Sequence, residues 1–339
     1  MSKVNRQWRL AARPEGLAGD DHFQWVEQAV PEPGPGQARV RVLWLSLDPT
    51  NRPWMWSEDT YLPAQALGDV MRGVAIGRVE ASQRPDLPEG CLVSGLLGWQ
   101  DYCLVGAGDR VGRLPEIPDL PLSTRMALLG HIGLTAWFGI HDVGRVRAGE
   151  TVLVSGAAGA VGSLAGQGAR LAGARVVGIA GTADKCEWIT GELGFAGAID
   201  YRAQSVPEAL DRLCPEGVDV YFDNVGGTLL EMVLERIRLR GRVAVCGMIS
   251  QYNAPGGRAS APGPRNLFQL VVRRARMEGF LASDYAGRAA EAYEPLLEGY
   301  RAGRIRVREH VIEGLEQAPA AMNRLFDGTH RGKLMVRVA

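Results

Sequence analysis

The chain has 339 residues, 46% of them hydrophobic and 22% charged, which is enough for about two globular domains. Its 38 lysines and arginines equal its 38 aspartates and glutamates, so no strong field attracts nucleic acid or an anionic membrane surface. No apolar run approaches the ~18 residues that span a bilayer, and the N-terminal residues lack the apolar core of a signal peptide.

The first third of the chain predicts a partly open β-barrel. Short apolar runs separated by Pro- and Gly-rich turns predict strands at residues 23–28, 38–46, 72–80, 91–95 and 100–105. Residues 48–71 are too polar and Pro-rich for a core strand, so we expect a long loop carrying Tyr61, Trp54 and Trp56. These aromatic side chains either line a pocket or close the end of the barrel.

From residue 151 the pattern changes to apolar strands alternating with amphipathic helices. The strands are predicted at 151–155, 175–180, 198–201, 218–224 and 242–246, and the helices at 160–172, 183–192, 205–213 and 227–237. This alternation is typical of an α/β protein with a doubly wound parallel sheet. Ligands of such sheets bind beyond the carboxyl ends of the strands.

The last part of the chain completes the sheet and returns to the barrel. We expect a mobile loop, serving as a lid, at 252–265, and then a helix at 266–274, a strand at 277–282 and a helix at 288–302. Segment 305–312, helix 317–326 and strand 333–338 have no partner in the parallel sheet. We therefore predict a discontinuous barrel domain, 1–126 with 303–339, and a nucleotide-binding domain, 127–302.

The stretch TVLVSGAAGAVG, residues 151–162, predicts a dinucleotide site. A strand, a glycine turn and a helix follow one another, and Gly156, Gly159 and Gly162 are spaced three residues apart. Backbone at the turn and at Ala160 and Val161 would approach the pyrophosphate at the helix N-terminus. Ala158 replaces the middle glycine of the strict fingerprint, which a negative φ tolerates. The alternative is an ordinary strand-to-helix connection.

The end of the second strand indicates which nucleotide binds. It reads Ile179, Ala180, Gly181, Thr182, without the carboxylate that accepts from a ribose 2′-hydroxyl. Lys185, one of only three lysines with Lys3 and Lys333, follows in the next helix and would pair with a 2′-phosphate. The prediction is NADP(H). Asp184 turning toward a ribose, or Lys185 lying in solvent, would argue against it.

Cysteine and histidine spacing argues against a metal site. The cysteines are scattered and odd in number, which favours reduced thiols and a cytoplasmic location: Cys91, Cys103, Cys186, Cys214 and Cys246. We expect surface or capping positions for the histidines His22, His131, His141, His310 and His330. None of these residues has zinc-ligand spacing, so we predict a mechanism without a metal. A G-x-S-x-G elbow for hydrolysis is also absent from the sequence.

Several further motifs carry a family resemblance: LSLDP (45–49), GLTAWFGI (133–140), DVYFDNVGG (219–227), CGMISQYN (246–253) and GKLMVRV (332–338). With the glycine turn, they make the chain similar to the zinc-free medium-chain dehydrogenase/reductases. The resemblance is to the branch of prostaglandin/leukotriene and curcumin reductases. It implies a GroES-like barrel with a Rossmann domain, a homodimer, and NADPH-dependent reduction of a C=C bond conjugated to a carbonyl.

The resemblance also implies roles for individual residues. Lys185 and Tyr201 correspond to 2′-phosphate ligands, and backbone at Phe280, Leu281 and Ala282 to the contact with the carboxamide. Residues flanking the ribose and nicotinamide are Gly181, Thr182, Asn224, Cys246, Gly247, Ile249, Ser250 and Tyr252. Two departures occur: Thr50 stands where the family often has Tyr, and His330 stands where it usually has Asn near a cofactor phosphate.

A hydride delivered to the β-carbon of an enone or enal moves negative charge onto the carbonyl oxygen, which needs a hydrogen-bond donor. The Tyr252 phenol, at a strand's carboxyl end, is the first candidate, and Tyr61 on the barrel loop is the second. Packing or loop anchoring is the alternative role for both. Quinone reduction with the same cofactor, or NADPH binding without catalysis, are the alternative functions.

Overall fold

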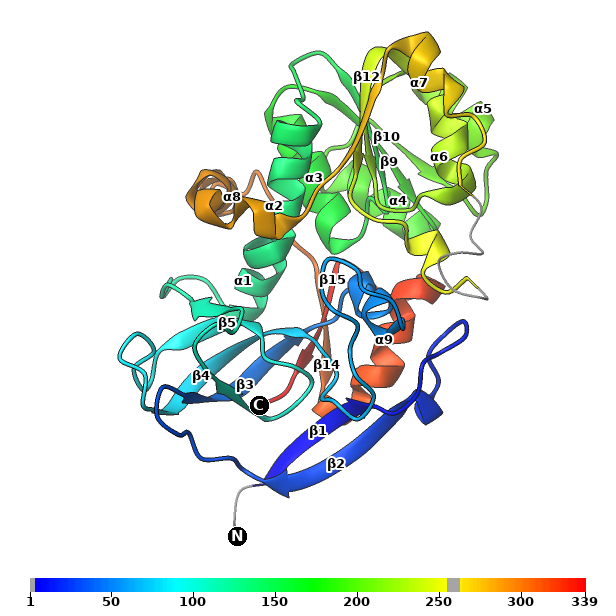
Figure 1. The fold of residues 1–339 in the computed structure, drawn as a ribbon. Helices are drawn as coiled ribbons and strands as arrows, with labels where there is room; N and C mark the ends of the chain where they lie inside the picture. The colour runs from blue at the N-terminus through cyan, green and yellow to red at the C-terminus, as the bar shows by residue number, and fades with distance from the viewer. Residues whose placement is uncertain (1–3, 255–262) are drawn as a thin grey trace.

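The computed structural model describes residues 4–254 and 263–339 and forms two domains (Figure 1). The upper domain in the figure holds a six-stranded parallel sheet in the order β10-β9-β8-β11-β12-β13. Its strands are β8 Thr151–Ser155, β9 Arg175–Ala180, β10 Gly197–Asp200, β11 Val218–Asp223, β12 Ile237–Val245 and β13 Arg276–Gly279. The predicted Rossmann-type sheet is confirmed.

Helices cover both faces of this sheet because its strands are apolar on both sides. Val152 and Val154 of β8 face a cluster that includes α2 Gly130–Phe138, α3 Ala160–Leu171, α4 Ala183–Gly191 and α8 Ala289–Arg301. Leu153, between them, faces the cluster of α5 Val206–Leu213 and α6 Gly227–Leu234, with α7 Phe268–Arg273 beside it. This alternation follows from the two-residue period of a strand.

The lower domain is built around a seven-stranded sheet, in which strands from both ends of the chain meet. Its order is β14-β15-β3-β4-β5-β7, and β6 also pairs with β3. The strands are β3 Ala38–Ser46, β4 Val74–Ser82, β5 Leu92–Leu96, β6 Tyr102–Val105, β7 Val111–Arg113, β14 Glu309–Glu313 and β15 Lys333–Arg337. β15 lies antiparallel to β3, so the end of the chain returns to this domain as expected. The exact domain boundaries stay a prediction.

Two smaller elements complete the lower domain, and α1 Leu122–Leu128 leads out of it toward α2. A separate antiparallel pair, β1 Val4–Leu10 and β2 Phe23–Ala29, packs beside the main sheet, and helix α9 Ala318–Asp327 precedes β15. Within the described residues, no helix is long and apolar enough to cross a membrane.

Three sequence expectations need correction. The helix predicted at 227–237 ends at Leu234, and the following strand begins at Ile237 rather than 242, because the arginine-rich run 238–242 hides an extended segment. The strand predicted at 277–282 ends at Gly279. Strand β1 was not expected, because it carries two buried polar side chains, Asn5 and Gln7, in place of an apolar alternation.

Candidate functional site

The glycine turn between β8 and α3 has the backbone that its sequence predicts. Gly156 has φ +59°, and a Cβ on Gly162 would lie 2.3 Å from the carbonyl oxygen of Gly156, so only glycine fits there. Gly159 caps α3, whose first turn is formed by Ala160 and Val161. Ala158 is not among the residues of positive φ, as its substitution for glycine requires. The turn is therefore compact and directs the α3 N-terminus beyond the sheet.

The chain just before β15 contacts this turn. The backbone N–H of Gly332 donates to the carbonyl oxygen of Ala158 at 3.2 Å, and Gly159 and Gly332 form an isolated parallel bridge. Figure 1 shows β15 of the lower domain reaching up toward the upper domain. The glycine turn thus lies at the junction of the two domains.

Lys185 is not solvated but buried at this junction. Thr182 caps α4 by accepting from the backbone N–H of Lys185, and the Lys185 ammonium donates to the carbonyl oxygen of Gly328 at 2.7 Å. Burial, together with the nearby Arg202 and Arg331, lowers the pKa of Lys185. An anion would relieve this repulsion. Asp184 is paired with Arg331 at 3.1 Å, which favours a phosphate site over a ribose carboxylate.

Two arginines join Lys185 in a cation cluster that the sequence analysis missed. The guanidinium of Arg202 donates to the carbonyl oxygen of Asp327 and lies over the Tyr201 ring, 5.7 Å from its centroid. The same ring packs against Gly181, where an added Cβ would come within 2.8 Å of it. Arg202 and Arg331 lie far apart in sequence, so no local motif signals that they meet.

The predicted role of His330 stays untested, and its geometry opposes it. The imidazole Nδ1 donates to the carbonyl oxygen of Arg324 at 2.8 Å. Burial lowers the pKa of His330 to about 4, so the ring is neutral at pH 7. Its Nε2 then carries a lone pair and has no proton to donate to a phosphate.

A buried carboxylate shapes the turn after β11. Asp223 accepts from the backbone N–H groups of Val225 and Gly226 at 2.9 Å and from the Tyr221 hydroxyl at 2.8 Å. Burial nevertheless raises its pKa. This turn places Asn224 so that its amide donates to the carbonyl oxygen of Ser155 at 2.6 Å. Two strand ends are thereby fixed side by side.

Residues 246–252 follow β12 beyond the carboxyl edge of the sheet, and we call this segment the shelf. Ser250 donates to the carbonyl oxygen of Val225 at 2.6 Å, and the Tyr252 hydroxyl accepts from the backbone N–H of Met248 at 3.1 Å. That hydroxyl lies against Gly247, 3.1 Å from where a Cβ would be. The backbone N–H of Ile249 donates to the carbonyl oxygen of Asn224. Burial raises the pKa of both Tyr252 and Cys246 to about 12, so both groups stay protonated.

The barrel loop brings aromatic side chains to this shelf. The Trp56 ring meets the Tyr252 ring edge-on with centroids 6.2 Å apart, whereas Trp54 and Met55 are buried within the barrel domain. Tyr61 is 45% exposed, and its hydroxyl accepts from the Trp54 indole at 3.1 Å and is hydrogen-bonded to Thr50. Burial is the main cause that raises the pKa of Tyr61. Tyr61 also contributes to the raised pKa of Tyr252, so the two predicted tyrosines lie near each other, one from each domain.

The backbone predicted to meet a carboxamide follows β13. Phe280 packs into the space left by Gly139, where an added Cβ would come within 2.4 Å of its ring, and it meets Phe222 edge-on. Leu281 caps the short helix that begins at Ala282. These residues lie at the same carboxyl edge as Tyr252, but the described loop ends at residue 254. The lid predicted at 252–265 falls largely on residues 255–262, outside the described residues.

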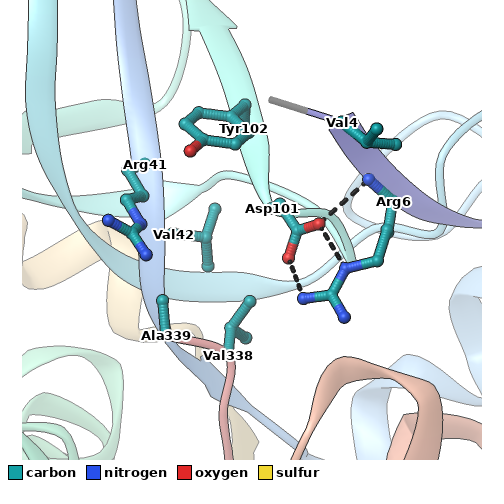
Figure 2. Close-up of a pocket in the computed structure, with 8 residues that line it drawn as sticks. All are labelled: Val4, Arg6, Arg41, Val42, Asp101, Tyr102, Val338 and Ala339. Atoms are coloured by element: carbon teal, nitrogen blue, oxygen red, sulfur yellow. Dashed lines mark hydrogen bonds and ion pairs between the residues drawn. The ribbon is translucent and has the colours of Figure 1, made fainter. Parts of the chain in front are cut away.

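A pocket of about 260 Å³ lies elsewhere, in the barrel domain beside the C-terminal residue (Figure 2). The Arg6 guanidinium and backbone N–H bind the Asp101 carboxylate there, at distances of 2.7–3.0 Å. The Asp101 carboxylate links β1 to the start of β6, and no predicted site residue lines the pocket. We therefore assign this ion pair a structural role.

Comparisons with known proteins show the family of this chain. Residues 6–113 match the family described as N-terminal domain of oxidoreductase, and residues 160–298 match zinc-binding dehydrogenase. The NADPH-dependent curcumin reductase of Escherichia coli is 39% identical over 99% of this chain and 97% of its own length. The 2-alkenal reductase (NADP(+)-dependent) of Nicotiana tabacum is 40% identical over 93% of this chain and 90% of its own.

A crystal structure of CurA from Vibrio vulnificus in complex with NADPH superposes with a TM-score of 0.90. It is 36% identical, and the match covers 98% of this chain and 99% of that one. The chain therefore belongs to the medium-chain dehydrogenase/reductase family, as its motifs predicted.

The described residues do not fit the zinc that one family description names. Among residues 4–254 and 263–339, no three Cys, His, Asp or Glu side chains gather as a metal site needs. At the cleft, the carboxylate of Asp48 lies beside His131 but also accepts from the ammonium of Lys333. A cation of the protein itself therefore already balances this carboxylate.

The same residues do fit a phosphorylated dinucleotide. Gly156 and Gly162 give the turn the compact backbone that leads into α3, and the N-terminus of that helix is the kind of site that binds a pyrophosphate. Lys185, Arg202 and Arg331 gather at the tip of β9, where a 2′-phosphate would sit.

Proposed function

We propose that this chain uses NADPH to reduce the C=C bond of α,β-unsaturated aldehydes and ketones. One observation carries the proposal: the cation cluster follows β9 and Tyr252 follows β12, so both lie at the carboxyl edge of one Rossmann sheet, and Trp56 of the barrel loop meets Tyr252 there. The names of the curcumin and 2-alkenal reductases, which resemble the whole chain, support the same reaction class.

The residues divide into those that hold the cofactor and those that receive the substrate. The glycine turn would bind the pyrophosphate, Lys185 and Tyr201 the 2′-phosphate, Asn224 and the shelf 246–252 the ribose and nicotinamide, and backbone 280–282 the carboxamide. When bound, NADPH supplies a hydride to the β-carbon of the alkene. Charge then develops on the carbonyl oxygen, where a preorganised donor lowers the barrier.

Tyr252 is prepared to act as such a donor. Its hydroxyl oxygen already accepts from the backbone N–H of Met248, which fixes the phenol and leaves its proton free to donate. The Trp56 ring further limits its motion. Tyr61 is fixed in the same way by the Trp54 indole, and it would act from the barrel side of the cleft.

We further propose that the protein works without zinc and in the cytoplasm. The Asp48–Lys333 ion pair supports the first proposal, because a zinc ion would have to displace the ammonium. The second is supported by five cysteines that are all free of disulfide bonds.

A homodimer through the nucleotide domains is also proposed. Strand β13 lies at the edge of its sheet, where unpaired backbone groups favour another strand. Beside it, α7 and β12 expose large apolar side chains: Leu239, Leu267, Phe268, Val271 and Val272. Phe268 is 73% exposed, which a monomer in water disfavours.

The test is NADPH oxidation over a panel of 2-alkenals, 3-alken-2-ones, cyclic enones and benzoquinones, with product identification by mass spectrometry. We expect the saturated carbonyl compound from the alkenes, and slower turnover with NADH and with quinones. Turnover of quinones alone would contradict the proposal, as would NADPH binding without oxidation by any activated alkene.

A further inference from the structure

A cluster of charged side chains lies in the cleft beside the residues described above. Asp48, in the loop after β3, accepts from the Lys333 ammonium at 2.7 Å and pairs with Nε2 of His131 at 3.0 Å. Ser46 donates to the same carboxylate, and the Lys333 ammonium also donates to the carbonyl oxygen of Leu47 at 2.8 Å. Three separate parts of the chain thus meet at one carboxylate.

The electrostatics of the cluster keep this carboxylate ionised. Burial alone would raise the pKa of Asp48, but Lys333 and His131 together lower it below its usual range. The Lys333 ammonium balances the charge of Asp48. The hydrogen bond of His131 to this carboxylate therefore does not require the imidazole to be charged. Nε2 must then donate, which fixes the imidazole ring and leaves Nδ1 as its second functional atom.

His131 differs from its two partners in exposure. The Lys333 and Asp48 side chains are 1% and 10% exposed, whereas the His131 side chain is 30% exposed. Within the described part of the chain, the His131 ring is hydrogen-bonded through Nε2 alone. The ring is therefore held at one nitrogen and accessible at the other.

The cluster lies near both the glycine turn and the two tyrosines. Gly332, directly before Lys333, donates to the glycine turn at Ala158. On the other side, the charge of Asp48 contributes to the raised pKa of Tyr61, and Tyr61 in turn to that of Tyr252. His131 lies in the first turn of α2. A substrate between Tyr61 and the sheet would lie next to it.

The cleft needs a group that gives up a proton, and its tyrosines are poor acids. Burial raises the pKa of Tyr252 to about 12, so it donates a hydrogen bond at neutral pH but holds its proton. Imidazole is the side chain that releases and regains a proton most readily near pH 7. The Asp48 carboxylate behind His131 holds the ring in one orientation, as the carboxylate of a catalytic triad does.

We propose that His131, oriented by Asp48, is the proton donor to the carbonyl oxygen of the unsaturated substrate. This proposal rests on the reductase function proposed above and names the residue that supplies the proton in that reaction. The hydride forms a C–H bond at the β-carbon, and the electron pair of the C=C bond moves to the carbonyl oxygen. From the protonated form of the ring, the Nδ1–H proton passes to that oxygen, giving an enol and a neutral imidazole. The α-carbon of the enol then takes a proton from solvent while its O–H proton is released, which gives the saturated carbonyl compound, and a further solvent proton returns to Nδ1.

The test compares His131→Ala and His131→Gln with wild type in single-turnover NADPH oxidation by an alkenal. General acid catalysis contributes about 10²–10⁴-fold, so both variants should lose about a hundredfold or more in rate. Their NADPH dissociation constants, from fluorescence titration, should stay within about twofold, because no cofactor contact is removed. Added imidazole should restore at least a tenth of the lost rate to His131→Ala, with efficiency that follows the basicity of substituted imidazoles.

His22→Gln is the matched control, since His22 lies in a surface turn with Asp21 and should leave the rate unchanged. A His131→Gln enzyme with full activity would overturn the proposal, because glutamine keeps a donor to Asp48 without being an acid. So would loss of rate in His131→Ala that no imidazole rescues, which indicates a structural link between the helix and the barrel.

A second measurement does not depend on turnover. In protein labelled with ¹⁵N-histidine, the Nδ1 resonance that disappears in His131→Gln should shift when a saturated ketone and NADP⁺ are added together. An unshifted resonance with saturating ketone would contradict the proposal. If wild type reduces no alkene at all, the proposed function fails, and this resonance still decides whether a carbonyl group binds at His131.

Discussion

The ammonium of Lys185 donates a hydrogen bond to the carbonyl oxygen of Gly328 over 2.7 Å. Lys185 belongs to the first turn of α4 in the Rossmann domain, whereas Gly328 follows α9 in the segment that returns to the barrel. The contact therefore joins the proposed 2′-phosphate site to the other domain. A phosphate bound at Lys185 would be held where both domains contribute groups.

Lys185→Gln should reduce discrimination between NADPH and NADH. A hydrogen bond to a charged group contributes about 1.5–3 kcal/mol, so the NADPH dissociation constant should rise by about 10- to 100-fold. NADH, which lacks the 2′-phosphate, should bind almost as before. Fluorescence titration of both nucleotides measures this ratio.

Arg212→Gln, which removes an exposed cation on α5, is the control and should change neither affinity. If Lys185→Gln weakens both nucleotides equally, the lysine supports the domain junction and does not select the phosphate. Higher salt should weaken NADPH binding to wild type more than to the variant, because screening acts on the lost charge.

Much of the fold is predictable from local sequence. The strands Ala38–Ser46, Thr151–Ser155 and Arg175–Ala180 have the predicted bounds, because each is an apolar run that ends at a polar or glycine-rich turn. The glycine turn is equally local, since positions 156 and 162 each need glycine for steric reasons. Family, fold and sheet type were therefore within reach of the sequence.

The parts that were missed depend on contacts between distant residues. Arg331 meets Asp184, and Lys333 meets Asp48, across separations that no spacing rule reports. His131 was expected at a surface or capping position, but it is held by Asp48 from the other domain. Buried polar pairs of this kind form between residues that only the tertiary fold brings together. Their partners can therefore be identified only from the structure of the two domains in contact.

Tyr252→Phe should slow turnover by about a hundredfold, because loss of one preorganised donor costs on the order of 3 kcal/mol. NADPH binding should be retained, since the hydroxyl packs against the shelf without carrying charge. Burial raises the pKa of Tyr252 to about 12, so its phenol stays protonated at neutral pH. Its ionisation should therefore not reduce activity at any pH below about 10.

Steady-state kinetics with an alkenal, and the profile of kcat/KM against pH, measure both effects. Tyr61→Phe in the same assay shows how the donor role is shared between the two sides of the cleft. Full turnover by Tyr252→Phe would remove Tyr252 from the mechanism and leave it as a packing residue beside Trp56.

Phe268→Arg should convert the proposed dimer to monomer. An arginine at the 73%-exposed Phe268 would place a charge on each copy in the middle of the apolar surface of α7. Light scattering coupled to size-exclusion chromatography measures the mass, and Leu17→Arg, on the barrel surface, serves as the control. A wild-type mass of one chain at micromolar concentration would refute the dimer.

Asp48→Asn should destabilise the protein more than other carboxylate substitutions, because it leaves the buried Lys333 ammonium without its counter-ion. Breaking a buried ion pair in this way costs about 3–5 kcal/mol. The pKa of Asp48 is lowered in the folded state, where Lys333 and His131 overcome the effect of burial. Its contribution to stability is therefore complete above its unfolded pKa of about 3.9 and is lost as the pH falls further.

Urea unfolding at about pH 7, 5 and 2.5 tests this, with Asp86→Asn as the control, since Asp86 is an exposed carboxylate paired with Arg84. We expect the difference between wild type and Asp48→Asn to be equal at pH 7 and 5 and smaller once the pH lies well below 3.9. An equal loss in the Asp86 variant, or no loss in Asp48→Asn, would show that the Lys333 ammonium does not depend on Asp48 for its burial.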